Sequence, residues 1–434
     1  MHLGLHGPGR AVSRWRMHKT VTPKAPPRPD SPPDDAVSWR ARLDLWEPHI
    51  GAFVALCPET DPVGAGPLSG LVAGVKDVID VAGQVTRNGS AACADLPPAS
   101  RDAEVVAALR AAGARIAGKT VTTEFAFTDP TDCRNPHDIT RSPGGSSSGS
   151  GAAVAAGLVD IALGTQTAGS LCRPAAYCGV VGLKPGYGVL SRRGVTPLAP
   201  SFDSVGVIAR SVGVARAAFE VMSGQPGASP EALVTAARWL LPGDVQAGAD
   251  MLEALDEAMH GLSRCAAPRA APPVACDTQA IVEAHRTVML AEAAQWHGGL
   301  ASPDKVARLR PNFRAALERG AALEATQVAG ARRLLHEAAE GFWQAMQGVD
   351  VILTLPVPEG APKLDGSTGF QHWLTIWTVF GGPLVSLPWG VDRLGRPRAV
   401  MLAGRPGTDA GVLALAERLE ACAPPLPVPV LPAV

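Results

Sequence analysis

The sequence lacks the features that mark several large classes of protein. Its formal net charge is −1 over 434 residues, so no basic excess favours nucleic acid or an acidic membrane surface as partner. No apolar run approaches the ~18 residues of a membrane-spanning helix. The eight cysteines contain no C-x-x-C pair and the ten histidines no H-E-x-x-H pattern. We therefore predict free thiols in a reducing cytoplasm, no metal site and no cofactor.

The composition predicts one folded region between two biased ends. Hydrophobic residues make up 46% of the chain and charged residues only 18%, which allows a large core. Residues 1–36 are basic and proline-rich without the apolar stretch of a secretory signal, so we predict a disordered extension. Residues 37–422 are predicted to form a single domain, and residues 423–434 a proline-rich tail.

Strand and helix patterns alternate along the chain. Apolar runs of strand length occur at 71–75, 114–120, 158–164, 179–185, 349–358 and 381–390. Helical spacing fills 39–56 and 102–112, and Gly113 follows the second helix as a stop. Residues from about 215 to 345 are richer in helix and are predicted to be a variable insert. This alternation predicts an α/β fold with a central mixed β-sheet and helices on both faces.

Two glycine-rich stretches fit signatures that their context contradicts. GARIAGKT at 113–120 has the spacing of a phosphate-binding loop, but a helix ends at Gly113, where that loop needs a strand. GSSSG at 145–149 has the spacing of a nucleophile elbow around Ser147, but the segment before it contains proline and is a poor strand. A flexible linker is the third interpretation of 145–149, yet this stretch passes directly into an alanine-rich helix. We therefore disfavour nucleotide binding, an α/β-hydrolase elbow and a linker.

Several ordered motifs resemble the amidase signature family, most specifically over residues 67–215. They are GVKDVIDVAG, GARIAGKTVTTEFAF, GGSSSGSGAAVAAG, TQTAGS and SRRGVTPLAPSFDSVGVIARSV. The later GGPLVSLPWG and VMLAGRPGTDAGVLALAERLE resemble the closing part of the family. The resemblance implies that 37–422 is one amidase-signature catalytic domain. It also implies hydrolysis of a carboxylic amide, at its C–N bond, to an acid and ammonia or amine.

The resemblance further implies a Ser-cisSer-Lys triad of Lys76, Ser146 and Ser170. Lys76 matches the lysine of the V-K-D segment, Ser146 the serine on a cis peptide bond, and Ser170 the nucleophile. The chemistry agrees, because a serine hydroxyl needs a base, and burial can lower the lysine pKa from its usual ~10.4. The implied oxyanion hole consists of the backbone N–H groups of Thr167, Ala168, Gly169 and Ser170.

Four positions depart from the residues usual in that family: Gln166, Cys172, Ser148, which replaces a glycine, and Gly186, which replaces a threonine. Gln166 and Cys172 stand where many members have aspartate and arginine. If that pair is buried, losing both members avoids a stranded charge, which costs ~3–5 kcal/mol. Restoring aspartate alone at Gln166 should then destabilise the fold. Cys172 is also a candidate reactive thiol, with a buried inert thiol as the alternative.

The sequence leaves the substrate and the partners open. Arg141 and Arg173 are candidates for binding an acidic group, and Trp373 and Trp377 for pocket walls or for the core. We expect a small linear amide, other than a peptide, as substrate. A homodimer, an amidotransferase subunit that releases ammonia to a partner, and a non-catalytic scaffold remain alternatives.

Overall fold

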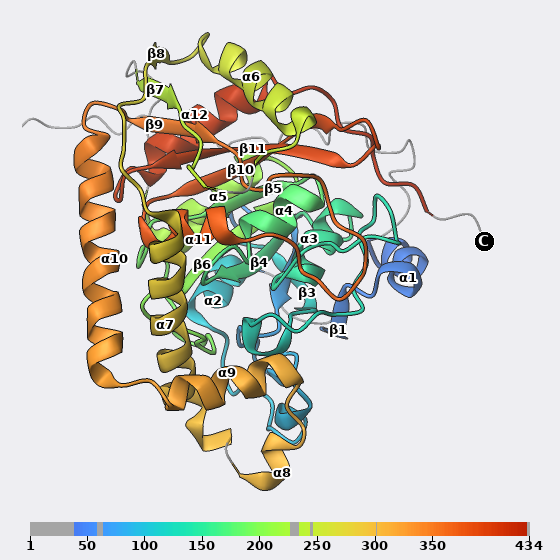
Figure 1. Ribbon diagram of the computed structural model, residues 1–434. Helices are drawn as coiled ribbons and strands as arrows, with labels where there is room; N and C mark the ends of the chain where they lie inside the picture. Colours follow the sequence, from blue (N-terminus) through green and yellow to red (C-terminus); the bar gives the residue numbers. More distant parts are fainter. Residues whose placement is uncertain (1–38, 59–63, 226–233, 244–245, 301, 432–434) are drawn as a thin grey trace, which may run out of the picture.

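The computed structural model describes residues 39–58, 64–225, 234–243, 246–300 and 302–431, and its strands form one sheet (Figure 1). The predicted extension at 1–36 and the last three residues lie outside this part of the chain, and residues 424–431 contain no helix or strand. The strands are β1 (Phe53–Leu56), β2 (Val72–Lys76), β3 (Arg115–Thr120), β4 (Ile161–Gln166), β5 (Val181–Lys184), β6 (Ser204–Ala209), β7 (Thr235–Arg238), β8 (Ala267–Arg269), β9 (Val351–Thr354), β10 (Leu384–Val391) and β11 (Pro397–Gly404).

The sheet is mixed, as predicted. Its strand order is β1-β3-β2-β4-β6-β5-β10-β11-β9-β7-β8. The neighbours of β2 and of β7 run parallel to them, whereas the strands between β4 and β9 pair antiparallel. Every residue of β4, β5, β6 and β11 is buried, which fits central strands covered on both faces.

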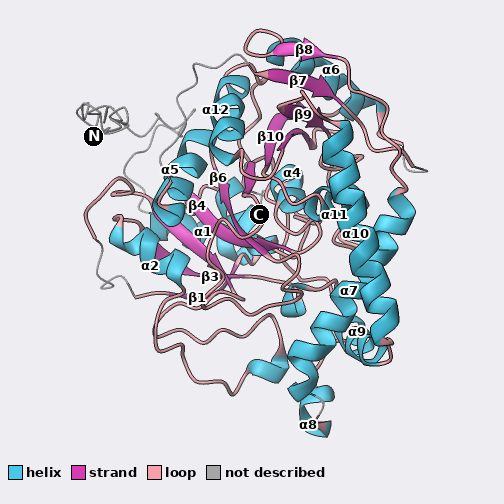
Figure 2. Cartoon of the chain, turned by 90° about the vertical axis from the view of Figure 1, so that its left-hand side faces the viewer, coloured by secondary structure: helices cyan, strands magenta, loops and turns pink. Residues whose placement is uncertain are grey.

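Helices cover both faces of this sheet, which confirms the predicted α/β architecture. They are α1 (Trp39–Ile50), α2 (Glu104–Ala111), α3 (Ser148–Ala155), α4 (Cys172–Tyr177), α5 (Val212–Ser223), α6 (Ala249–Leu262), α7 (Thr278–His297), α8 (Pro303–Val306), α9 (Pro311–Ala321), α10 (Ala325–Ala345), α11 (His372–Val379) and α12 (Asp409–Glu420). Figures 1 and 2 show α3 and α4 on one face and α2, α5 and α12 on the other. None of the helices in the described residues is long and apolar enough to cross a membrane.

Three local predictions need correction. The helix predicted over 39–56 ends at Ile50, because Gly51 adopts a φ of +55° and the next residues pair with β3 as β1. The strand predicted at 158–164 begins only at Ile161 and runs on to Gln166. The insert at 215–345 is not purely helical, since it supplies β7 and β8 to the edge of the sheet. These two strands are too short for an alternating pattern to reveal them.

The disfavoured phosphate-binding loop is excluded by the position of Lys119. This lysine lies inside β3 and is fully buried. Its Nζ lies 3.1 Å from Asp77 Oδ1 and donates to the Ile79 carbonyl at 2.6 Å. The residue therefore stabilises the fold from within and has no free ammonium for a phosphate.

Candidate active site

The end of β2 places Lys76 between hydroxyls from two other segments. Its side chain is fully buried, and Nζ lies 2.7 Å from Ser146 Oγ and 2.7 Å from Thr165 Oγ1. The structure thus brings Lys76 and Ser146 together as predicted. Thr165 was not foreseen, because only the parallel pairing of β2 with β4 brings it beside Lys76.

Burial sets the protonation of Lys76. Desolvation lowers its pKa to about 7, with the Asp203 carboxylate acting to raise it and the Arg173 guanidinium to lower it. Asp77, the next residue, turns away and pairs with Lys119, since successive side chains of an extended chain point to opposite sides. A large fraction of Lys76 is therefore an uncharged amine near neutral pH.

The two serine segments are tied together through their backbones. The Gly145–Ser146 peptide bond is cis, as the resemblance implied. The Ser147 N–H donates to the Ser170 carbonyl at 3.1 Å, and Ser170 is only 6% exposed. Within the described residues no hydrogen bond joins the hydroxyls of Ser146 and Ser170 directly. Ser170 is nevertheless held against the segment that carries the Lys76–Ser146 contact.

The loop at 167–170 contains backbone N–H groups that donate to no acceptor among the described residues. Among the described residues, no hydrogen bond uses the N–H groups of Ala168, Gly169 or Ser170. Gly169 permits a close approach, because a Cβ there would lie 3.0 Å from the Leu374 side chain. Buried backbone N–H groups without a protein acceptor are available to an external oxygen atom.

The side chain of Gln166 holds the loop at 167–170 in place through hydrogen bonds. Its Oε1 accepts from the N–H groups of Leu171 and Cys172 at 3.1 and 3.0 Å, and its Nε2 donates to Thr378 Oγ1 at 3.0 Å. Thr378 in turn donates to the Ala168 carbonyl at 2.6 Å. The unusual residue at position 166 therefore supports both sides of the loop without a charge.

Cys172 has the inert character of the alternative interpretation. It is fully buried, and burial raises the pKa of its thiol to about 12. All eight cysteines are free, as predicted. No group of three or more His, Cys, Asp or Glu side chains in the described part of the chain could hold a metal ion.

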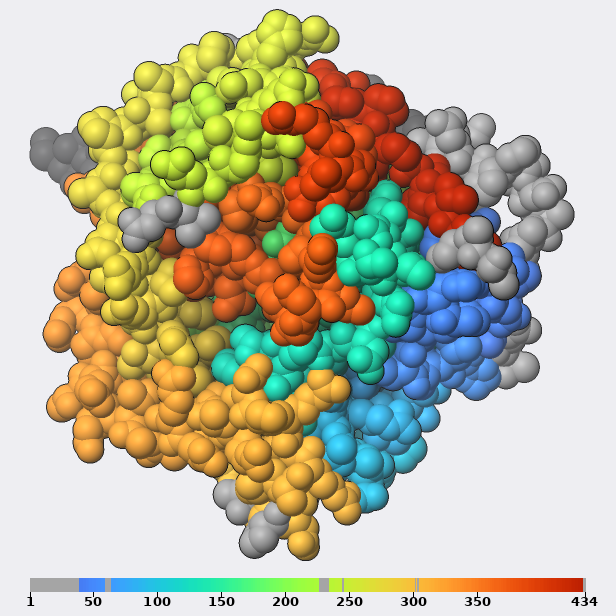
Figure 3. Space-filling view, turned by 45° about the vertical axis from the view of Figure 1, so that its right-hand side comes forward, coloured from blue at the N-terminus to red at the C-terminus, as the bar shows by residue number. Residues whose placement is uncertain are grey.

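The predicted substrate-binding arginines make internal contacts. Arg173 is 1% exposed; its Nε donates to the Gly145 carbonyl at 3.0 Å and its Nη1 to the Gly369 carbonyl at 2.6 Å. Arg141 pairs with Asp138 at 3.0 Å and donates to the Ala361 carbonyl at 2.8 Å. Arg173 thus holds the peptide just before Ser146, and Arg141 ties two surface segments together. Figure 3 shows those segments, around 130–145 in teal and 360–370 in orange, in contact on one face.

The predicted tryptophans differ from each other. Trp377 is 1% exposed and packs edge-on against Trp239 and Phe342, with ring centroids 5.6 and 5.5 Å apart. It is a core residue. Trp373 borders a cavity of about 480 Å³ between α7 and α11.

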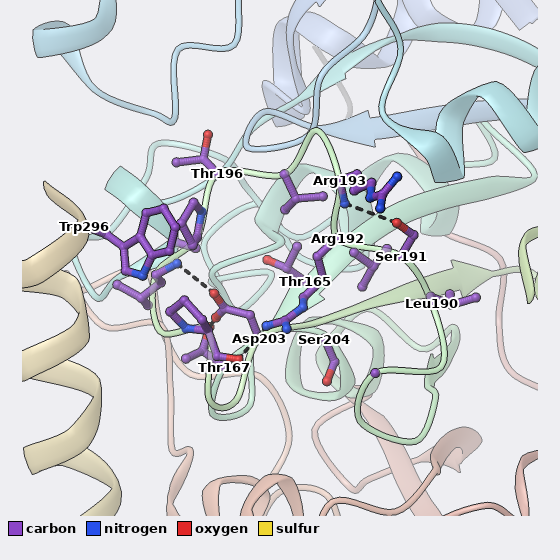
Figure 4. Close-up of a pocket in the computed structure, with 17 residues that line it drawn as sticks. Thr165, Thr167, Leu190, Ser191, Arg192, Arg193, Thr196, Asp203, Ser204 and Trp296 are labelled. Atoms are coloured by element: carbon purple, nitrogen blue, oxygen red, sulfur yellow. Dashed lines mark hydrogen bonds between the residues drawn. The ribbon is translucent and has the colours of Figure 1, made fainter.

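A cavity of about 500 Å³ lies on one side of the loop at 167–170 (Figure 4). We call it the Asp203 cavity; its walls include Thr165, Thr167 and Asp203. The Asp203 carboxylate accepts from Thr167 Oγ1 at 2.6 Å and from the N–H groups of Leu198 and Ala199. Burial raises the pKa of this carboxyl group, while these hydrogen bonds lower it. The cavity therefore reaches the hydroxyl that touches Lys76.

A second cavity, of about 340 Å³, adjoins the same loop from α7 and α9, and we call it the Arg286 cavity. Its wall includes His285, whose Nε2 lies 2.8 Å from the Thr167 carbonyl. A carbonyl only accepts, so Nε2 carries the proton. Burial lowers the His285 pKa to about 4, so the ring is neutral at pH 7. Thr167 thus lines the Asp203 cavity, and its carbonyl accepts from a residue that lines the Arg286 cavity.

Comparison with known proteins identifies the class of this fold and site. A family model described as Amidase matches residues 60–243. The chain is 32% identical to a glutamyl-tRNA(Gln) amidotransferase subunit from Anaeromyxobacter sp. (strain K), over 90% of this chain and 92% of that protein. The chain therefore belongs to the amidase signature family.

Other relatives act on different compounds. The AtzE subunit of 1-carboxybiuret hydrolase from Pseudomonas sp. (strain ADP) is 46% identical over 170 residues, which cover 38% of this chain and 37% of that protein. The crystal structure of native peptide amidase from Stenotrophomonas maltophilia is similar with a TM-score of 0.75 and 26% identity, covering 91% of this chain and 94% of that one. The family thus includes both amidases and amidotransferase subunits.

Proposed function

We propose that this chain hydrolyses a small linear amide, other than a peptide, to an acid and ammonia or amine through an acyl-enzyme on Ser170. The observation that carries this proposal is the buried Lys76 amine, 2.7 Å from the Ser146 hydroxyl and close to the Ser170 segment. Lys76, Ser146 and Ser170 act as base, relay and nucleophile. This is the Ser-Lys version of the general nucleophile–base arrangement.

The first step forms a tetrahedral intermediate on Ser170 Oγ. A neutral amine has two N–H bonds and one lone pair, so Lys76 can donate to Thr165 and accept the proton of Ser146. As Ser170 Oγ bonds to the amide carbon, its proton passes to Ser146 and the Ser146 proton passes to Lys76. The carbonyl oxygen becomes an oxyanion, which the free N–H groups of Ala168, Gly169 and Ser170, together with that of Thr167, stabilise.

The next steps form the Ser170 ester and then hydrolyse it, which regenerates the free enzyme. The Lys76 ammonium returns its proton through Ser146 to the amide nitrogen, the C–N bond breaks, and ammonia or amine leaves. Water then attacks the ester while its proton follows the same relay to Lys76. The returning proton goes to Ser170 Oγ as the acid departs, so no proton is gained or lost by the protein.

Labelling with a fluorophosphonate tests the nucleophile. The reagent should modify Ser170 and inactivate the protein, whereas Ser170→Ala should not be labelled. Ser263→Ala, on the exposed end of α6, serves as the matched control and should react normally. Labelling elsewhere, or an unlabelled folded protein, would contradict the proposed function.

The similarity to amidotransferase subunits supports a second candidate, release of ammonia from glutamine to a partner chain. The two candidates differ in what the isolated chain can do. A hydrolase releases ammonia from small amides alone. A transferase subunit should co-purify with partner chains and need them for turnover of glutamine.

A further inference from the structure

The charged side chains that border the Arg286 cavity are all basic. Arg286 of α7 and Arg319 of α9 line it together with the imidazoles of His285 and His372, and no aspartate or glutamate is among its lining residues. Both arginines are exposed. The cavity therefore presents positive charge to whatever enters it.

The packing of α7 against α9 brings the two arginines to one place. A Cβ at Gly320 would lie 2.0 Å from the Leu290 carbonyl, so the two helices touch at this point. Arg319 is next to Gly320, and Arg286 is one helical turn from Leu290, a rise of about 6 Å. The two side chains thus flank the same stretch of wall.

Neither guanidinium has an internal partner. Within the described residues, Arg286 and Arg319 take part in no ion pair and no side-chain hydrogen bond. Glu283, the carboxylate nearest to Arg286 along α7, accepts from Gln279 at 3.1 Å; it lines the neighbouring cavity of about 480 Å³, which Arg286 also borders, but not the Arg286 cavity itself. Two arginines without a carboxylate partner at one cavity favour an external anion.

Two walls of this cavity are bonded to the segments that carry the catalytic serines. His285 donates to the Thr167 carbonyl at 2.8 Å, at the start of the nucleophile loop. The Phe127 carbonyl accepts from Thr123 Oγ1 at 2.8 Å, and the Thr123 N–H donates to the Ser146 carbonyl at 3.2 Å. Residues that line the cavity are therefore connected to both serine segments by one or two hydrogen bonds.

A third wall reaches the same loops from α11. Gln371 lines the cavity, and a Cβ at Gly169 would lie 3.5 Å from the Gln371 Cβ. The Gln371 side chain also accepts from Arg173 at 3.4 Å, and Arg173 holds the Gly145 carbonyl. Three separate elements that line the cavity thus contact the oxyanion loop or the segment that carries Ser146.

We propose that the substrate is an anionic amide, the monoamide of a short dicarboxylic acid, whose carboxylate binds Arg286 and Arg319 while its amide lies at Ser170. This inference rests on the proposed function and names its substrate class. A volume of about 340 Å³ suits a small molecule of this kind. Since no carboxylate lines the cavity, an ammonium on the same substrate would lack a partner, so glutaramate should bind better than glutamine.

Calorimetry on Ser170→Ala tests this without turnover. Glutaramate is compared with pentanamide, which has a methyl group in place of the carboxylate. Glutaramate should bind tighter by roughly tenfold or more, since charge-assisted hydrogen bonds to arginine are lost in the neutral amide. Adding Arg286→Gln and Arg319→Gln together should remove that preference. Arg314→Gln, which removes the same charge from α9 away from the cavity, should keep it.

Equal affinities of the two amides, including no binding of either, would overturn the inference, as would a preference that survives the double substitution. Fluorophosphonate labelling of the double variant with Ser170 intact separates this result from the proposed function. Labelling at the normal rate shows that the arginines act on the substrate and not on the triad. Loss of labelling in a folded double variant would count against a pure binding role.

Discussion

The charged groups of the Asp203 cavity, which Thr167 lines, differ from those of the Arg286 cavity, whose His285 is hydrogen-bonded to Thr167. In the Asp203 cavity each charged group has an internal partner: Arg192 donates to the Pro200 carbonyl, Arg193 pairs with Glu104 at 3.2 Å, and Asp203 accepts from Thr167. In the Arg286 cavity the two arginines have none among the described residues. A charged group with partners inside the protein can shift the pKa of a neighbouring residue, as the Asp203 carboxylate raises the pKa of Lys76. Charges left without a partner are available to a ligand.

The largest effect should come from Lys76, the proposed base. Lys76→Ala removes the proton acceptor, and we expect kcat to fall by roughly 10³- to 10⁵-fold. Anionic and neutral amides should lose activity alike, because the lysine acts on the reacting atoms and not on the carboxylate. Ammonia release at saturating substrate measures this. A loss confined to one substrate class would assign Lys76 to binding.

The next effect concerns the support beneath the shared loop. Gln166→Asp should destabilise the fold by about 3 kcal/mol, since it buries a carboxylate in place of a neutral amide. It also forfeits the hydrogen bond to Thr378. Chemical denaturation measures the free energy of unfolding. Adding Cys172→Arg should restore part of the loss, and an unchanged melting profile of the single variant would contradict the account.

The pH dependence should report Lys76. Because only the uncharged amine accepts a proton and its pKa is lowered to about 7, kcat/KM should rise with pH and level off above 7. Below that midpoint it should fall by about tenfold per pH unit. Rates for a neutral amide between pH 5.5 and 8.5 measure the profile. A flat profile over this range would mean that the lysine is not the titrating base.

The smallest effect is a shift of the pH midpoint, which should differ between a variant of the Asp203 cavity and a variant of the Arg286 cavity. The Asp203 carboxylate raises the Lys76 pKa, so Asp203→Asn should move the midpoint to lower pH, by about one unit. Arg286→Gln should leave the midpoint in place and raise KM for anionic amides only. Profiles for both variants, measured with a neutral amide, provide the comparison. A shift in the arginine variant and none in the aspartate variant would reverse the roles of the two cavities.

Local sequence patterns predicted the inner part of the fold well. The apolar run at 71–75 became β2, and Gly113 ended α2 with a φ of +96°. Such features depend on neighbours in sequence and on burial, which apolar periodicity reports. Strands β7 and β8, at one end of the sheet, escaped prediction. The pairing of β7 with β9 and of β8 with β7, and not their own pattern, makes them strands.

The candidate site divides in the same way. Motif order along the chain predicted Lys76, Ser146 and the cis peptide bond before Ser146, and the structure brings these together. The roles of Thr165 and Asp203 could not be predicted, because nothing local marks a hydroxyl or carboxylate that a neighbouring strand will place beside a lysine. The sequence suggested Arg173 as a substrate-binding residue, whereas in the structure its side chain donates to the Gly145 carbonyl.

The sequence by itself determined the alternation of strands and helices, the family and the order of the triad residues, since each is written in local pattern or motif. Tertiary structure alone decided how far the Lys76 pKa falls and which arginines lack a partner. Desolvation and charge pairing depend on groups far apart in the chain. Only the packing of β2 beside β4, and of α7 against Gly320, brings those groups together.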